Sequence, residues 1–259
     1  MDLSLTINAW IDEEIMFAQQ LGARSVFARV GAQPGSAPGW DGQHLTWLAN
    51  RVEKAGLTLA GLQAAEIPVT GAALAGSALA VMALDGAVRL IEAAGAANIG
   101  MVSLAAGTGI RAEELPALAE AAARSGVKLA LPAALLAGAG ARPSAASLVE
   151  ALRGLPDSAG LNASADLLPD WLQQAALSRL YLVSIENEQR PTGKRSSTRF
   201  DELLPICWRL RQAGYAGLIR LGQPSKWKGD SSEDHQARAF SAGYFRAALQ
   251  AFASTGTPR

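Results

Sequence analysis

The chain has 259 residues, of which 49% are hydrophobic, and its 23 basic and 23 acidic side chains give a formal net charge of zero. This length is typical of one α/β barrel, and the balanced charge argues against a basic surface for nucleic acid or anionic lipid. A single cysteine, Cys207, excludes a disulfide within the chain. With no leader-like start and no apolar stretch long enough for a bilayer, we expect a cytoplasmic protein without membrane or nucleic-acid partners.

Short apolar runs alternate with segments of helical periodicity along the chain. The first run, 3–9, precedes a helix that begins near Asp12 and ends at Gly22, and the second, 25–31, precedes a helix that ends at Gly56. The later runs begin at Leu57, Ile99, Val127, Ala159, Leu177 and Ala216, and the later helices cover 84–94, 113–125, 147–153, a segment near Trp171, 200–213 and 234–252.

These eight strand-then-helix units predict parallel strands joined by right-handed crossovers, closed into a single-domain (β/α)₈ barrel over residues 1–259. A doubly wound open sheet is the alternative, although Asn8, Ala9 and Trp10 stand where its glycine-rich phosphate loop would lie. We interpret 68–83 and 187–199 as insertions over one face of the barrel.

Polar and aromatic residues follow the predicted strands, at the end where such barrels carry their chemistry. Glu66, Glu186 and Lys226 are the candidates for proton transfer and charge stabilisation. A flat aromatic wall beside charged donors suits a sugar, and arginine suits the carboxylate of a sugar acid. The candidate ligand-binding residues are Arg29, Trp40, Gln63, Asn187, Arg190 and Trp227.

Other reactive side chains are assigned structural roles. His44 falls within the second helix and His235 near the start of the last one, so both are interpreted as surface or packing residues. Cys207 lies in a helix expected to pack outside the barrel, as core filler. Ser103 and Ser184 lack a plausible histidine partner, which argues against a Ser-His-Asp triad.

Several stretches together resemble the mannonate dehydratases and related xylose-isomerase-like barrels. They are IDEEIMFAQQLGARSVFA and GWDGQHLTWLANRVEKAGLTLAGLQAAEIP near the start, and GYAGLIRLGQPSKWKGD with ARAFSAGYFRAALQAF near the end. The resemblance covers most of the chain and is weak between 68 and 159. It implies a sugar or sugar acid as substrate, isomerase or dehydratase chemistry, and a divalent metal at the strand ends.

The residues at the expected metal-binding positions depart from that family. Where relatives carry acidic or histidine ligands at the ends of strands five to eight, this chain has Pro132, Ser164, Ser184 and Gly222, and Leu167 stands near the sixth. None of these side chains supplies an anionic or imidazole donor to a divalent ion. We therefore predict no metal site and no cofactor.

Three hypotheses follow from this pattern. The first is a degenerate barrel without metal that binds a sugar or sugar acid, or acts only as a structural or partner subunit. The second is a metal-free dehydratase or isomerase with Glu66 or Glu186 as base and Lys226 or Arg29 as electrophile. The third is a metal enzyme with rearranged ligands Glu66, Asp166, Glu186 and His235. Self-association through Ala/Leu-rich helices is also compatible with the sequence.

Overall fold

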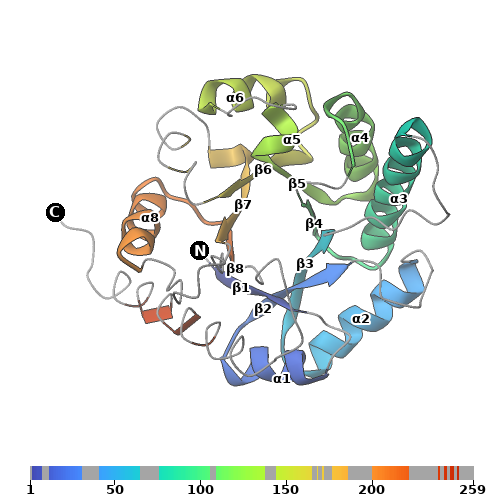
Figure 1. The fold of residues 1–259 in the computed structure, drawn as a ribbon. Coiled ribbons are helices and arrows are strands. Elements are labelled where there is room, and N and C mark those ends of the chain that lie inside the picture. The colour runs from blue at the N-terminus through green and yellow to red at the C-terminus, as the bar shows by residue number, and fades with distance from the viewer. Residues whose placement is uncertain are drawn as a thin grey trace.

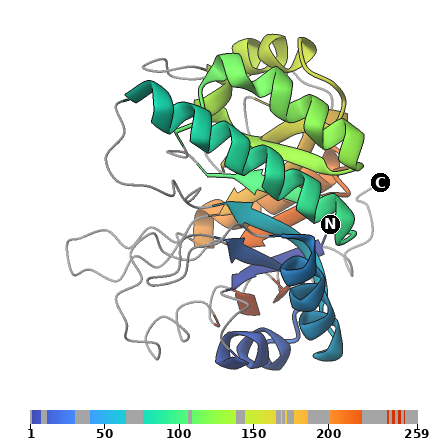
Figure 2. The same cartoon turned by 90° about the vertical axis from the view of Figure 1, so that its right-hand side faces the viewer.

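Eight parallel strands close into a barrel in the order β1 to β8 in this computed structural model of the chain. Figure 1 shows the ring of strands with the helices outside it, and Figure 2 shows helices running beside the strands. The structure describes residues 2–7, 12–30, 41–64, 76–105, 109–137, 144–164, 168, 171, 177–185, 200–221, 239, 242–243, 246–247 and 250. The predicted barrel is confirmed, and the open sheet is excluded by the pairing of β1 with β8.

The strands occur where the apolar runs predicted them, and most helices do too. The strands are β1 (Asp2–Ile7), β2 (Ser25–Val30), β3 (Thr58–Ala64), β4 (Met101–Leu104), β5 (Lys128–Pro132), β6 (Ala159–Ser164), β7 (Leu180–Ile185) and β8 (Leu218–Leu221). The α-helices are α1 (Asp12–Gln20), α2 (Gly42–Lys54), α3 (Gly76–Ala96), α4 (Leu115–Ser125), α5 (Ala133–Ala137), α6 (Ala145–Arg153) and α8 (Phe200–Gln212), with 3₁₀ turns at Ala112–Glu114 and Leu177–Arg179.

Local sequence signals fix several helix ends. Asp41 caps α2 by accepting a 2.9 Å hydrogen bond from the backbone N–H of His44. This bond, together with the bond to the His44 side chain, holds the pKa of the Asp41 carboxyl below its usual range. His44 itself is exposed on α2, as predicted. Ser144 caps α6 through the Ser147 backbone N–H, and Gly126 ends α4 in the left-handed conformation at φ 67°.

Helix α3 begins earlier than we predicted. The sequence interpretation placed 68–83 in an insertion and started the helix at Leu84, whereas the structure extends α3 back to Gly76. The added turns, rich in alanine, were misread because they show little amphipathic contrast. Alanine has the highest helix propensity of all residues, so composition and not periodicity was the better signal there.

Outward-facing strand residues and inward-facing helix residues form the main core. Alternation along β1 sends Leu5 and Ile7 outward into this layer, which also includes Leu45 and Leu48 of α2. A smaller apolar cluster lies inside the barrel and contains Phe27, Met101, Ala130 and Leu182. Within the described part of the chain, no helix has the length and apolar character needed to cross a bilayer.

Cys207 of α8 belongs to this core, as predicted, and is fully buried. Burial raises the pKa of its thiol to about 11. We expect native protein at pH 8 to react with a disulfide reagent far more slowly than urea-unfolded protein, because the thiolate is the reactive form. Since the unfolded thiol ionises at lower pH, this residue also lowers stability as the pH rises above about 9. Equal labelling rates in the two states would contradict the assignment.

Candidate functional site

The carboxyl end of the barrel interior is polar. In a barrel of this kind, alternate strands contribute four inward side chains to each layer. The register and the alternation place Phe27, Ser103, Asn162 and Arg220 in one such layer. Two contacts support this grouping: Asn162 Nδ2 donates to Ser103 Oγ at 3.2 Å, and the Arg220 guanidinium lies 5.9 Å from the centre of the Phe27 ring.

One side of this interior is a closed hydrogen-bond network. Asn162 of β6 donates to Ser103 of β4 and accepts a 2.6 Å bond from the Ser184 hydroxyl of β7. All three residues are at most 7% exposed. Buried polar groups that satisfy one another in this way hold strands in a fixed arrangement. The network therefore holds β4, β6 and β7 in a fixed arrangement along one side of the open carboxyl end of the barrel, which we call the mouth. This side is the β4–β7 wall.

The neighbouring strands β2 and β3 present donors that the described structure leaves uncommitted, and Gln63 of β3 is the register partner of Ser103 in that network. Arg29 of β2 and Gln63 of β3 are register partners, so their side chains point to the same face, toward the barrel mouth. Both are partly exposed, and neither has a hydrogen-bond or ion-pair partner as far as the described structure goes. Arg29 and Gln63 face the space that a ligand would occupy.

Arg220 is a site residue that the sequence interpretation missed. It is the second inward position of β8, after Leu218, is only 2% exposed, and has Ser184 of β7 and Ser4 of β1 as register partners. An arginine inside a barrel is unusual because desolvating a charge is expensive. The signal was present in the sequence: one charged residue stands at an inward position of the apolar run AGLIRLG.

The other predicted site residues cannot be placed. Those outside the described residues are Trp40, Glu66, Glu186, Asn187, Arg190, Lys226 and Trp227, together with Asp166, Leu167, Gly222 and His235 of the metal hypotheses. Their assignments stay predictions. Of the nine predicted catalytic and ligand-binding residues, the structure locates Arg29 and Gln63 only, and it brings these two together on adjacent strands.

The described strand ends do not fit a divalent metal. Pro132, Ser164 and Ser184 lie at the ends of β5, β6 and β7, and Arg29 and Gln63 add a cation and an amide. No group of three or more histidine, cysteine, aspartate or glutamate side chains with the geometry of a metal site occurs within the described ranges. A divalent ion in a protein requires several anionic or imidazole donors, and this set supplies neither.

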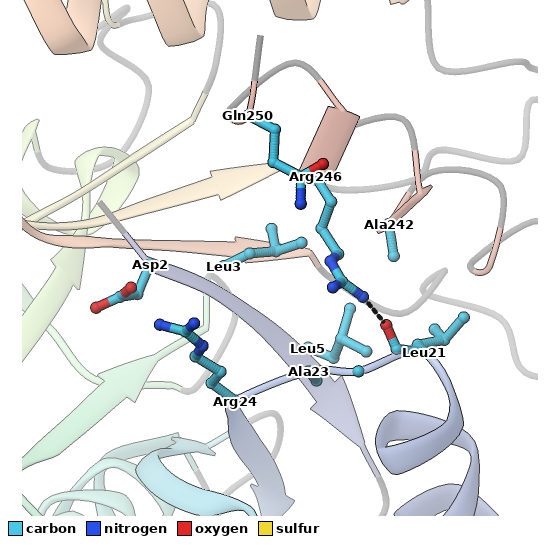
Figure 3. Close-up of a pocket in the computed structure, with 10 residues that line it drawn as sticks. Asp2, Leu3, Leu5, Leu21, Ala23, Arg24, Ala242, Arg246 and Gln250 are labelled. Atoms are coloured by element: carbon cyan, nitrogen blue, oxygen red, sulfur yellow. Dashed lines mark hydrogen bonds between the residues drawn. The ribbon is translucent and has the colours of Figure 1, made fainter. Parts of the chain in front are cut away.

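A cavity of about 370 Å³ lies at the amino-terminal end of the barrel. Figure 3 shows Leu3 and Leu5 of β1 beside Arg24, with Arg246 donating a hydrogen bond to the Leu21 carbonyl. Barrels of this type carry their chemistry at the other end of the strands. We therefore assign the candidate functional site to the carboxyl end.

Comparison with known proteins defines the class of fold. The sequence matches no protein-family model and no curated protein. Among solved structures, it is similar to an L-ribulose 3-epimerase (16% identity, 100% of this chain and 98% of that one, TM-score 0.65). It is also similar to D-allulose 3-epimerase from Methylomonas sp. (13%, 96% and 98%, 0.64). A third is a sugar phosphate isomerase/epimerase from Parabacteroides distasonis (11%, 95% and 96%, 0.59).

The likeness extends over almost the whole chain and confirms the fold expected from the xylose-isomerase-like resemblance. The chain has the (β/α)₈ barrel that these sugar epimerases and isomerases share. At this level of identity the comparison establishes architecture only. The mannonate dehydratase part of the resemblance, and the loss of metal ligands, stay predictions.

Proposed function

We propose that this protein binds a sugar or sugar acid at the carboxyl end of the barrel without a divalent metal. The observation that carries the proposal is the asymmetric mouth, in which the β4–β7 wall is internally hydrogen-bonded and Arg29 and Gln63 remain available on β2 and β3. A guanidinium donates in a planar fork that matches a carboxylate, and an amide offers both a donor and an acceptor to hydroxyl groups.

Two further features support a polyol ligand. The structures that share this fold include epimerases and isomerases of sugars. The donor set in the described mouth is cationic and neutral, a composition that attracts an anionic polyol and gives a divalent ion little to bind. The proposed role is binding by a barrel without the metal-dependent reaction that the xylose-isomerase-like resemblance implies.

Direct titration tests the proposal. Hexuronic and aldonic acids, with the corresponding neutral sugars, should be titrated into the protein by calorimetry in a chelator and again with added manganese. We expect saturable binding of at least one acid that is the same in both conditions. If no sugar or acid binds in either condition, the binding proposal is wrong.

The same samples separate binding from catalysis. We expect no turnover of the bound acid or sugar when products are followed by NMR. Turnover that persists in chelator and disappears in Glu186→Gln or Glu66→Gln would favour a metal-free dehydratase or isomerase with that glutamate as base. Turnover that requires manganese would favour the rearranged metal site.

A further inference from the structure

Three hydroxyl groups inside the barrel lack hydrogen-bond partners. Ser4 and Thr6 of β1 and Ser25 of β2 are 0%, 1% and 8% exposed, and within the described structure their side-chain oxygens have no hydrogen-bond partner. Alternation along β1 points Ser4 and Thr6 inward, because Leu5 and Ile7 belong to the outer core. Ser25 is the register partner of Ser4 and shares its face.

Buried hydroxyls in native proteins are almost always paired, with protein or with ordered water. The spacing here suits water. Adjacent strands lie about 4.8 Å apart, and residues two apart on one strand are separated by about 6.6 Å. Both backbone separations exceed a direct hydroxyl–hydroxyl bond of about 2.8 Å. A single water between two oxygens spans roughly twice that bond length, about 5.6 Å, which suits the pair on adjacent strands, whereas the pair along β1 requires more than one water.

The direction and size of neighbouring interior side chains favour space for water beside β1. An ideal Cβ at Gly61 of β3 would lie 2.5 Å from the ring of Phe27, so that ring on β2 is turned toward β3 and away from β1. Ala130, another interior residue, is small, whereas barrel interiors are usually filled by branched side chains. Arg220, the register partner of Ser4 on β8, is buried beside it and makes this part of the interior polar.

We propose that the barrel interior beside β1 holds a short file of ordered water molecules bridging Ser25, Ser4 and Thr6. Ser25 lies at the first residue of β2, near the amino-terminal end, and Thr6 lies two residues beyond Ser4 toward the mouth. The file therefore hydrates the barrel core along its axis and reaches the floor of the mouth from below. It is independent of the ligand assigned to that mouth.

Two measurements test the water file. A high-resolution crystal structure of the wild-type chain should show ordered water within hydrogen-bonding distance of Ser4 Oγ and Thr6 Oγ1. Thr6→Val keeps the side-chain shape and removes the hydroxyl, so it should lower Tm by roughly 2–4 °C if that hydroxyl is bonded to water. In a dry core the same change would raise Tm, because it removes an unsatisfied buried group.

Thr58→Val, at an exposed position of β3, is the matched control and should leave Tm nearly unchanged. A Thr6→Val protein whose Tm rises or stays at the wild-type value would overturn the proposal. A wild-type electron-density map without water at these hydroxyls would also overturn the proposal. If the variant does not fold, this map alone decides the question.

Discussion

Replacing Asn162 by alanine should lower the free energy of unfolding by about 2–4 kcal/mol. The substitution removes both hydrogen bonds that join β6 to β4 and β7, and it leaves the hydroxyls of Ser103 and Ser184 buried without their partner. It also opens a cavity in a residue layer that is otherwise closed to solvent. Urea denaturation followed by circular dichroism measures the change.

Asn50 provides a matched control, because it is an exposed asparagine in the middle of helix α2. Asn50→Ala should change stability by less than about 0.5 kcal/mol. A double-mutant cycle with Ser184→Ala should give a coupling free energy of roughly 0.5–3 kcal/mol with Asn162→Ala, since the two residues share a 2.6 Å bond. If the two substitutions change the free energy of unfolding additively within error, the hydrogen bond between Asn162 and Ser184 contributes no coupling to stability.

Replacing Arg29 by glutamine should weaken binding of a sugar acid about 10- to 100-fold, because a charge-assisted bond to a carboxylate contributes roughly 1.5–3 kcal/mol. Arg29 makes no internal hydrogen bond or ion pair within the described structure, so its removal should leave Tm nearly unchanged. Affinity for the corresponding neutral sugar should change little. Calorimetric titration of wild type and variant with both ligands measures the difference.

Arg24→Gln is the matched control for Arg29→Gln, because it makes the same substitution at a different position. Arg24 is an exposed arginine immediately before β2, at the amino-terminal end of the barrel, and Arg24→Gln should leave sugar-acid affinity at the wild-type value. Arg29→Lys keeps the positive charge but loses the planar fork, so it should recover only part of the affinity. Equal binding by wild type and Arg29→Gln would remove Arg29 from the site while leaving the binding proposal open.

The architecture was predictable because it depends on local regularity repeated many times. Eight apolar runs separated by helical segments are compatible with few closed parallel topologies. An error of one residue at the boundary of a run does not change the number of runs. The start of α3 was mispredicted at Leu84 instead of Gly76 because its first turns carry little amphipathic pattern. The periodicity of apolar side chains indicates which face of a helix is buried. The first turns of α3 are helical because alanine has a high helix propensity, a signal that periodicity does not contain.

The floor of the mouth was harder to predict, since it depends on register. Asn162 bonds a serine 59 residues away, and nothing local in AGLNASA identifies that partner. Ser184 was noted only as a missing metal ligand and as a serine without a histidine partner, although it donates to Asn162. The position of Arg29 and Gln63 at the mouth was predictable because both stand near the ends of predicted strands, where the fold determines the direction in which side chains point. Their role in ligand binding stays a prediction.

The metal content of the purified protein tests most directly whether the mouth functions without a divalent ion. We expect elemental analysis after gel filtration to find far less than one manganese, zinc, magnesium, cobalt or iron per chain, with sugar-acid binding unaffected by chelator. A stoichiometric ion that is lost in chelator together with ligand binding would contradict the proposal. It would then point to Glu66, Asp166, Glu186 and His235 as the ligands.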